Sequence, residues 1–179
     1  TAEVIGFNEN KVLLMPLGKT TGIKLGDVVV STGDLPSVRV SNDLLGRILD
    51  GLGNPIDKKG DLRATAQYPI HGKPINPMDR RPIKKLFSTG IRAIDGLLTC
   101  GVGQRVGIFA GSGVGKSTML GMIARQSSAD VNVISLVGER GRELSAFIEN
   151  DLGPQGLAKS VIVISTSDHP PLMRMRAAL

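Results

Sequence analysis

The feature that most constrains the fold is a change of hydrophobic period along the second half of the chain. From Gly90 onward, apolar runs at 105–110, 131–137 and 161–164 alternate with segments in which apolar residues recur at helical spacing. The helical segments are marked by Ile91, Ile94, Leu97 and Leu98, by Met119, Leu120, Ile123 and Ala124, and by Leu144, Phe147 and Ile148. Apolar strands separated by amphipathic helices are typical of a parallel sheet covered on both faces. We therefore expect an α/β fold from residue 86 onward.

The first part of the chain follows a different pattern. Short β-branched runs at 4–7, 12–15, 27–30, 38–40 and 45–49 are separated by breaks that contain glycine. This spacing predicts a small all-β unit over residues 1–57, part of a barrel that would otherwise expose strand edges. Four prolines favour a linker or a surface segment over residues 58–85. We interpret its basic cluster as a solvated loop rather than a polyanion site; it comprises Arg80, Arg81, Lys84 and Lys85.

Composition disfavours several classes of protein. The 22 Lys and Arg outnumber the 16 Asp and Glu, and the net charge of +6 favours a polyanionic or acidic partner. With four Phe, one Tyr and no Trp, the chain offers few rings on which bases could stack, so nucleic acid is disfavoured as a partner. A lone cysteine, Cys100, excludes an intrachain disulfide and a cysteine-based zinc site. No apolar run reaches the roughly 18 residues of a membrane span, and we expect a cytoplasmic protein.

A glycine-rich octapeptide, Ala110-Gly111-Ser112-Gly113-Val114-Gly115-Lys116-Ser117, stands between the apolar run 105–110 and the next helical segment. It matches the phosphate-binding loop, with Ala in place of the first Gly. Its glycines allow successive backbone N–H groups to converge on phosphate oxygens, and the helix adds its positive N-terminal end. Lys116 supplies a charge for the β and γ phosphates, and Ser117 offers its hydroxyl to Mg²⁺. We predict that the nucleotide is bound by Gly111, Ser112, Gly113, Val114, Gly115, Lys116, Ser117 and Thr118.

Hydrolysis requires a carboxylate that orients or activates water, at the carboxyl end of a neighbouring strand. The run 131–137 ends in Gly138-Glu139-Arg140-Gly141-Arg142-Glu143, which makes Glu139 the natural catalytic candidate. Arg140 could meet a phosphate charge. Glu143 is a candidate for indirect contact with Mg²⁺, through a ligand of the ion. For Arg140 and Glu143, an exposed helix start with an ordinary ion pair is an equally good interpretation.

Three further blocks accompany these motifs: residues 44–53 (LLGRILDGLG), 89–96 (TGIRAIDG) and 166–174 (TSDHPPLMR). Together with segments 106–122 and 131–147, they make the chain resemble the rotary ATPase superfamily, and most of all the flagellar and type III secretion export ATPases. In that family, the positions matching Lys116, Ser117, Glu139 and Arg140 serve phosphate binding, Mg²⁺ binding, water activation and phosphate contact. Ala110 is also usual there. Non-catalytic relatives usually carry Gln where this chain has Glu139.

The resemblance implies a fold, an activity and partners. The expected fold is a P-loop (RecA-like) parallel sheet with helices on both faces, preceded by part of a small all-β barrel. The expected activity is ATP hydrolysis, with ATP and Mg²⁺ bound at the loop, by a homo-hexameric ring that drives protein export. Its expected partners are protein components of the export apparatus, and the exported proteins or their chaperones. The expected location is the cytoplasm, with peripheral association at the inner face of the membrane.

The length of the chain departs from the family pattern, because family members run to more than twice 179 residues. We therefore expect a fragment that holds the amino-terminal half of the P-loop ATPase domain, truncated, over residues 86–179. A strand that ends in a metal-organising Asp is not recognisable, and Asp168 fits that role poorly. The neighbour-supplied arginine finger is not recognisable either. We expect the 179-residue chain alone to be nearly inactive.

Alternative interpretations stay open at this point. Another rotary-type catalytic subunit, or a RecA-like ring helicase or transcription terminator, would share these motifs. The basic charge favours the helicase, and the scarcity of aromatic rings opposes it. A regulatory nucleotide-binding subunit is opposed by Glu139, and a pure interaction module is opposed by Lys116. The sequence does not distinguish a flagellum from an injectisome, and it does not identify the exported proteins.

Overall fold

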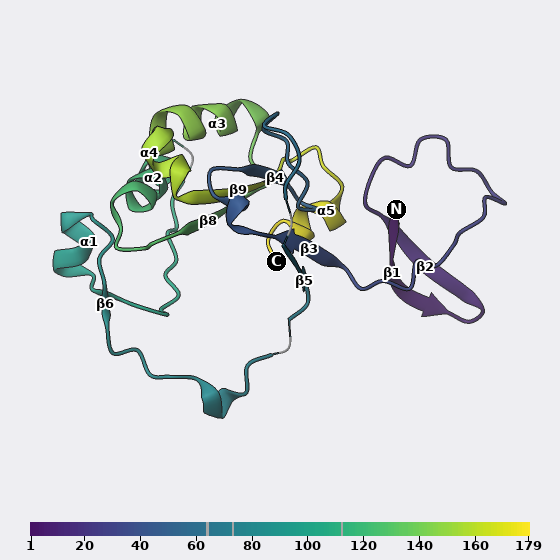
Figure 1. The fold of residues 1–179 in the computed structure, drawn as a ribbon, viewed down its shortest axis with the longest axis horizontal. Coiled ribbons are helices and arrows are strands. Elements are labelled where there is room, and N and C mark those ends of the chain that lie inside the picture. Colours follow the sequence, from purple (N-terminus) through teal and green to yellow (C-terminus); the bar gives the residue numbers. More distant parts are fainter. Residues whose placement is uncertain (64, 73, 112) are drawn as a thin grey trace.

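A three-stranded parallel sheet forms the centre of the structure (Figure 1). The computed structural model describes residues 1–63, 65–72, 74–111 and 113–179. The strand order is β4 (Ile48–Asp50), β9 (Ser160–Ser165) and β8 (Asn132–Val137), so the last of these strands in sequence lies in the middle. Because β9 is paired along both edges, it is the most buried strand, and Ile162 is fully inaccessible to solvent.

Four helical segments cover one face of this sheet. They are α2 (Lys116–Gln126), α3 (Gly141–Ala146), the π-helical segment η3 (Phe147–Leu152) and α4 (Gly153–Ala158). The core between helices and sheet consists of Ala124, Ile134, Leu136, Leu144, Phe147, Leu152, Ile162 and Ile164. Burial of these apolar stripes drives the packing of helices onto sheet. Helix α2 lies directly against η3, where Gly121 approaches the backbone of Asp151.

The opposite face of the sheet carries a smaller apolar cluster. It consists of Leu49, Leu62 and Val161, with Leu44 of the 3₁₀ turn η1 (Asn42–Leu44) packed against it. Helix α5 (Pro171–Arg176) follows β9, and the Ser135 hydroxyl of β8 donates to the carbonyl oxygen of Ala177 just after this helix. Helices therefore lie on both faces of a parallel sheet, which confirms the predicted fold class.

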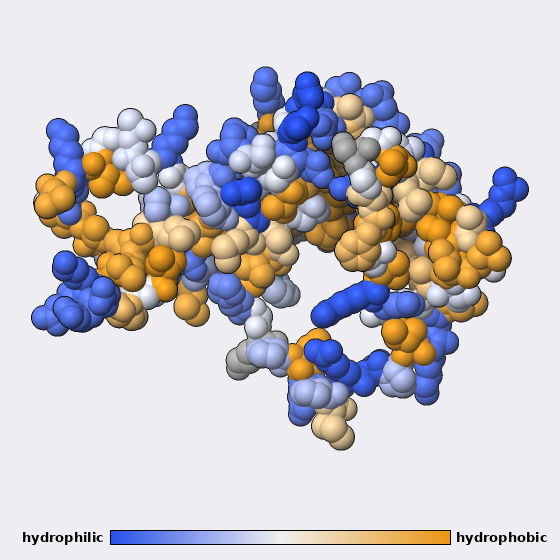
Figure 2. All heavy atoms as spheres, turned by 180° about the vertical axis from the view of Figure 1, so that it is seen from behind, coloured by the Kyte–Doolittle hydropathy of each residue, from blue (hydrophilic) through white to orange (hydrophobic). Residues whose placement is uncertain are grey.

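The amino-terminal residues form an antiparallel hairpin apart from the sheet, at the right of Figure 1. Strand β1 (Ala2–Asn8) pairs with β2 (Lys11–Pro16), with an irregular register between Val4 and Gly6. An ion pair of 2.9 Å joins Glu3 of β1 to Arg176 of α5 and ties the hairpin to the α/β part. Figure 2 shows apolar atoms gathered over the hairpin end of the molecule, where exposed side chains include Phe7, Ile23, Leu25, Val28, Val29 and Val30.

Two short antiparallel pairs complete the strand arrangement of the described residues. Strand β3 (Ser37–Val40) pairs with β5 (Ala66–Pro69), and β6 (Leu86–Phe87) pairs with β7 (Cys100–Gly101). Helix α1 (Arg92–Leu97) lies between β6 and β7 in sequence. The long connection from β5 to β6 contains the 3₁₀ turn η2 (Pro77–Asp79) and arches away from the sheet in Figure 1. The predicted linker 58–85 thus supplies one strand, β5, to a ladder.

Three predicted strands differ in the structure. Residues 105–110 have no strand partner in the described part of the chain, and Phe109 is 97% exposed, although the apolar run predicted a buried strand. The run 27–30 likewise forms no strand among the described residues. The run 45–49, expected in the barrel, contributes to β4, whose partner is β9. The reason is that apolar periodicity identifies a segment able to form a strand, but not the distant strand with which it pairs.

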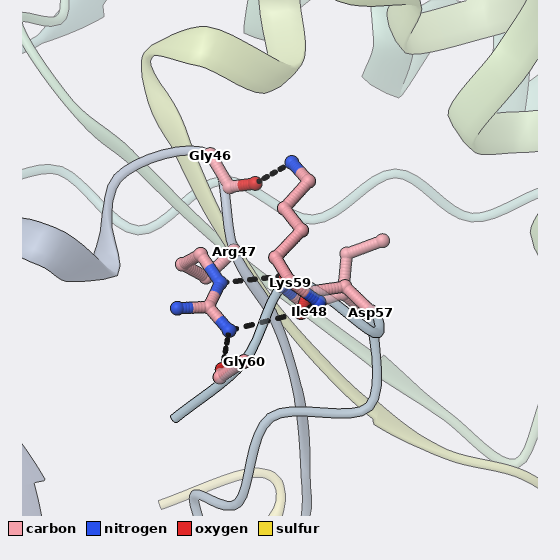
Figure 3. A network of polar contacts seen from close by, with 6 residues as sticks. All are labelled: Gly46, Arg47, Ile48, Asp57, Lys59 and Gly60. Atoms are coloured by element: carbon pink, nitrogen blue, oxygen red, sulfur yellow. Dashed lines mark hydrogen bonds and ion pairs between the residues drawn. The ribbon is translucent and has the colours of Figure 1, made fainter. Parts of the chain in front are cut away.

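The start of β4 is anchored by a buried ion pair, drawn in Figure 3. Arg47 Nε and Nη2 donate to the two carboxylate oxygens of Asp57 at 2.7 and 3.0 Å, and Nη2 also donates to the Gly60 carbonyl oxygen. Asp57 accepts, in addition, the backbone N–H groups of Ile48 and Lys59. The hydrogen bond from Arg47 is the main cause that holds the pKa of Asp57 well below its ordinary value. The network closes the loop after β4 back onto the strand.

Candidate functional site

The predicted phosphate-binding loop leads directly into α2. Gly113 and Gly115 have φ angles of +75° and +93°, in the left-handed region that glycine adopts without strain. Gly115 is the N-cap residue of α2, and its carbonyl oxygen accepts the N–H of Met119 at 2.9 Å. Gly111 and Val114 are exposed, and Ser112 lies outside the described residues. The helix therefore places its N-terminal N–H groups and its positive dipole end at a solvent-exposed loop.

Lys116 and Ser117 occupy the first turn of α2 and line a cavity of about 230 Å³. Glu139 and Glu143, from the segment after β8, line the same cavity. The rest of its lining is apolar and comprises Val106, Ile108, Leu120, Leu136, Leu144 and Phe147. Thr118 is exposed on α2 and is not among the described residues that line this space. Four polar side chains from two separate segments thus meet around one cavity.

Lys116 and Glu139 face each other across this space. The distance from Lys116 Nζ to Glu139 Oε1 is 3.9 Å, and the two side chains are 51% and 37% exposed. An ion pair this long and this accessible to water contributes only about 0–1 kcal/mol, because solvent screens it and both side chains lose conformational freedom. The ammonium group therefore stays available for an anion, and the carboxylate stays available for water.

Backbone geometry at the end of β8 places Glu139. Gly138 has a φ of +75°, which turns the chain out of the strand direction. Its N–H donates to the Ser165 carbonyl oxygen of β9 at 2.8 Å, and the Ser167 N–H donates to the Glu139 carbonyl oxygen at 3.2 Å. Because parallel strands bring their carboxyl ends to one edge of the sheet, the loop after β9 lies beside Glu139.

Arg140 lies differently from the other predicted site residues. Its guanidinium pairs with Glu143 at 3.8 Å, both side chains are more than half exposed, and Arg140 is not among the described residues that line the cavity. Glu143, the partner in this pair, also lines the cavity, where it can contact a ligand. In this structure Arg140 makes the ordinary surface ion pair that the sequence also allowed, and a contact with phosphate stays a prediction.

The donor set at the cavity fits Mg²⁺. Its polar oxygen donors are the Ser117 hydroxyl and the Glu139 and Glu143 carboxylates. Among the described residues, no three His, Cys, Asp or Glu side chains gather as a complete metal cage. Mg²⁺ prefers oxygen ligands and usually combines one or two protein groups with substrate phosphates and water. A site with few protein ligands beside a phosphate-binding loop is therefore suitable for this ion.

The loop after β9 contains Asp168, which the sequence pattern fits poorly to a metal-organising role. The Thr166 side chain is the main cause that lowers the pKa of the exposed Asp168 carboxyl. The neighbouring Ser167 contacts the backbone of Glu139. The signal available in the sequence was its position directly after a predicted parallel strand, where ligand sites of such sheets occur.

The chain is similar to known proteins over nearly its whole length. Residues 90–179 match the nucleotide-binding domain of the ATP synthase alpha/beta family, and residues 1–33 match the beta-barrel domain of the same family. The Flagellum-specific ATP synthase of Bacillus subtilis (strain 168) is 51% identical over 177 residues, which are 99% of this chain and 40% of that protein. The Type 3 secretion system ATPase of Sinorhizobium fredii is 46% identical over 177 residues, 99% of this chain and 39% of that protein.

A solved structure gives the same result. The assembled ATPase EscN of the enteropathogenic E. coli type III secretion system superposes with a TM-score of 0.89 at 47% identity, over 99% of this chain and 43% of that chain. A second structure, EscN in complex with its central stalk EscO, matches with the same TM-score. The chain spans about 40% of the length of the curated relatives it matches.

Proposed function

Because this chain belongs to the ATP synthase alpha/beta family, we propose that it is the ATP-binding and ATP-hydrolysing part of a protein-export ATPase. The observation that carries the proposal is the meeting of Lys116 and Glu139 across one cavity, 3.9 Å apart, although 23 positions separate them in sequence. Lys116 supplies a positive charge for the phosphates, and Glu139 supplies a carboxylate that orients the attacking water.

Each residue has a separate task in the proposed reaction. Gly113 and Gly115 shape the loop so that the N-terminal N–H groups of α2 contact the phosphates. Lys116 adds a positive charge at the β and γ phosphates, and Ser117 would hold Mg²⁺, which supplies further charge neutralisation when bound. Glu139 accepts a hydrogen bond from the attacking water, orients it, and takes its proton as the bond from water to the γ phosphorus forms. The bond from that phosphorus to the bridging oxygen of the β phosphate breaks in the same step, and ADP leaves with the electron pair.

The decisive experiment separates binding from turnover. Glu139→Gln keeps the size and the hydrogen-bonding oxygen of the side chain but removes the basic carboxylate. In the full-length gene product, this variant should bind Mg-ATP with unchanged affinity and lose hydrolysis by about 10²- to 10⁴-fold. Affinity is measured with a fluorescent ATP analogue, and turnover is measured by phosphate release.

A matched control is available on the same stretch of chain. Glu149, in η3, is exposed and does not line the cavity. Glu149→Gln makes the same chemical change away from the site and should leave both affinity and turnover as they are. Equal turnover numbers for Glu139→Gln and Glu149→Gln would show that Glu139 is only a residue at the start of α3.

We also propose the setting in which this reaction occurs. Assembled EscN and its complex with a central stalk support a homo-hexameric ring that acts with protein components of an export apparatus. Exported proteins or their chaperones are the proposed cargo, and the proposed location is the cytoplasm at the inner face of the membrane. Among the described helices, none is long and apolar enough to cross a bilayer. Analytical ultracentrifugation of the full-length gene product with Mg-ATP measures its oligomeric state, which should be a hexamer.

A further inference from the structure

The carboxyl-terminal end of α2 lies against the segment 88–90, which connects β6 to α1. The N–H of Ser128, just beyond the helix, donates to the Ser88 carbonyl oxygen at 2.9 Å. A methyl group on Gly90 would lie 2.4 Å from Cβ of Gln126 and 2.8 Å from its carbonyl oxygen. Gln126 is the last residue of α2, and the carbonyl groups of a helix point toward its carboxyl end. The backbone of Gly90 therefore lies directly at the end of the helix.

One carboxylate, that of Asp95 in α1, binds all three residues of this segment. Its Oδ1 accepts the N–H and the hydroxyl of Thr89 at 2.8 and 2.7 Å, and Thr89 is only 4% exposed. Its Oδ2 accepts the Ser88 hydroxyl at 2.8 Å and the Gly90 N–H at 3.1 Å. These bonds, that from the Thr89 N–H foremost, lower the pKa of Asp95 to about 2, so the carboxylate is charged at neutral pH.

Helix α2 connects this contact to the candidate site. It begins at Lys116, and a helix moves as a rod because its backbone hydrogen bonds join every turn to the next. The approach of Gly121 to η3 restricts sideways movement of α2, whereas the contact of Gly90 with Gln126 opposes movement along the helix axis. Glu139 follows a different element, β8, so an axial shift of α2 would change the distance of 3.9 Å between Lys116 Nζ and Glu139 Oε1.

The segment 88–90 and Asp95 stand apart from the site itself. They are not among the described residues that line the cavity or form the two apolar clusters of the sheet. Ser88 and Gly90 are exposed. Any influence of Asp95 on the cavity must therefore pass through α2.

We propose that Asp95 is a positioning residue for the phosphate-binding loop: through the segment 88–90 it fixes α2 along its axis, and with it the place of Lys116. The inference rests on the proposed function, since it assigns to Lys116 the role of binding phosphate. A functional group must be held within about 0.5 Å of its working place, because hydrogen bonds to phosphate weaken steeply with distance. A displaced helix would therefore carry its ammonium group out of reach of the β and γ phosphates.

The first test removes the carboxylate in the full-length gene product. Asp95→Ala should weaken the affinity for Mg-ATP about tenfold, at the low end of what a charged hydrogen bond contributes, because Lys116 is displaced but still present. Affinity is measured with a fluorescent ATP analogue, at a temperature where circular dichroism shows the variant to be folded. Asp130→Ala makes the same change at an exposed position beyond α2 and should leave affinity as it is. Equal affinities of these two variants would overturn the positioning role.

A second variant changes the same contact and leaves the carboxylate in place. Gly90 and Gly103 have φ angles of +76° and +93°, so alanine strains the backbone at both positions. Only Gly90→Ala also places a methyl group against Gln126, because the methyl group on Gly103 would meet none of the described atoms within 4 Å. Gly90→Ala should therefore weaken Mg-ATP binding, and Gly103→Ala should not. Equal affinities of the two variants would contradict the proposal.

The hydrogen bonds of Asp95 are tested from the donor side with Thr89. Thr89→Val keeps the shape of this buried side chain and removes the hydroxyl that donates to Asp95 Oδ1. It should weaken Mg-ATP binding in the same direction as Asp95→Ala. Thr89→Ser keeps the hydroxyl and should bind Mg-ATP as the unchanged protein does. If Thr89→Ser bound as weakly as Thr89→Val, the hydrogen bond would not be the cause, and the positioning role would be wrong.

A double-mutant cycle distinguishes action through Lys116 from general loss of structure. In the Lys116→Ala background, Asp95→Ala should weaken Mg-ATP binding by a smaller factor than in the unchanged protein, because the charge that it positions is already gone. The same factor in both backgrounds would overturn the positioning role. Unchanged affinity in Lys116→Ala alone would instead overturn the proposed function, so the two failures are distinguishable.

Discussion

The packing of α2 against η3 makes a sharp prediction at Gly121. A methyl group at this position would lie 2.6 Å from the carbonyl oxygen of Asp151 and 2.8 Å from its carbonyl carbon and Cβ. Two of these three contacts are with backbone atoms. The next residue, Leu152, is fully buried, so the backbone of η3 has no free space into which it can retreat. Gly121→Ala therefore forces α2 and η3 apart.

Two opposing effects decide the magnitude. Replacing a helical glycine by alanine favours the folded state by about 1 kcal/mol, because alanine loses less backbone freedom on folding. Overpacking a well-packed interface costs about 1–3 kcal/mol. Gly96 in α1 is the matched control, because its added methyl group meets nothing within 4 Å. The difference between the two variants isolates the steric cost, about 1–3 kcal/mol in favour of Gly96→Ala.

Urea unfolding followed by far-ultraviolet circular dichroism measures this difference. Gly96→Ala should unfold at the same or a higher urea concentration than the unchanged protein, and Gly121→Ala should unfold at a lower one. If Gly121→Ala were as stable as Gly96→Ala, the close approach of α2 to η3 would be refuted. The position of Lys116, which lies on the first turn of α2, would then be refuted as well.

Further predictions concern the site, the buried ion pair and the isolated chain. Lys116→Ala should weaken ATP binding by about 1.5–3 kcal/mol, the contribution of a charged hydrogen bond, which titration with a fluorescent ATP analogue measures. The pKa of Asp57 is lowered in the folded state, so its contribution to stability is present above the unfolded pKa and is lost as pH falls below about 4. Asp57→Asn should therefore lower the urea midpoint at neutral pH and flatten its acid dependence. Phosphate release by the 179-residue chain alone should stay near background, because an arginine finger alone can be worth about 10³–10⁵ in rate; a rate within tenfold of the full-length gene product would contradict this.

Local chemistry made much of the candidate site readable from the sequence. The octapeptide that ends in Lys116 and Ser117 has the residue pattern typical of a phosphate-binding loop. Glu139 follows an apolar run, at the end of a strand where ligands of parallel sheets bind. The structure brings these three side chains around one cavity. Their catalytic roles remain predictions that the variants above test.

Strand pairing was not readable in the same way. The run 45–49 looks like its β-branched neighbours in the first part of the chain, yet β4 pairs with β9, more than a hundred positions away. The run 105–110 has the composition of a buried strand, yet it pairs with no strand among the described residues. Apolar pattern measures the tendency of a segment to be buried, whereas pairing depends on which edges the folded chain brings within hydrogen-bonding distance.

The sequence by itself therefore determined what each segment can do, and the tertiary structure decided which segments do it together. Some features belong to single residues and their immediate neighbours, and these can be recognised in the sequence. They are the conformational freedom of glycine, a lysine after the loop and a carboxylate after a strand. The Arg47–Asp57 pair and the contact of Ser167 with Glu139 join groups that are ordinary in isolation. They acquire their roles only when folding places them within 3.2 Å, because hydrogen bonds act at contact distance and sequence separation does not reveal it.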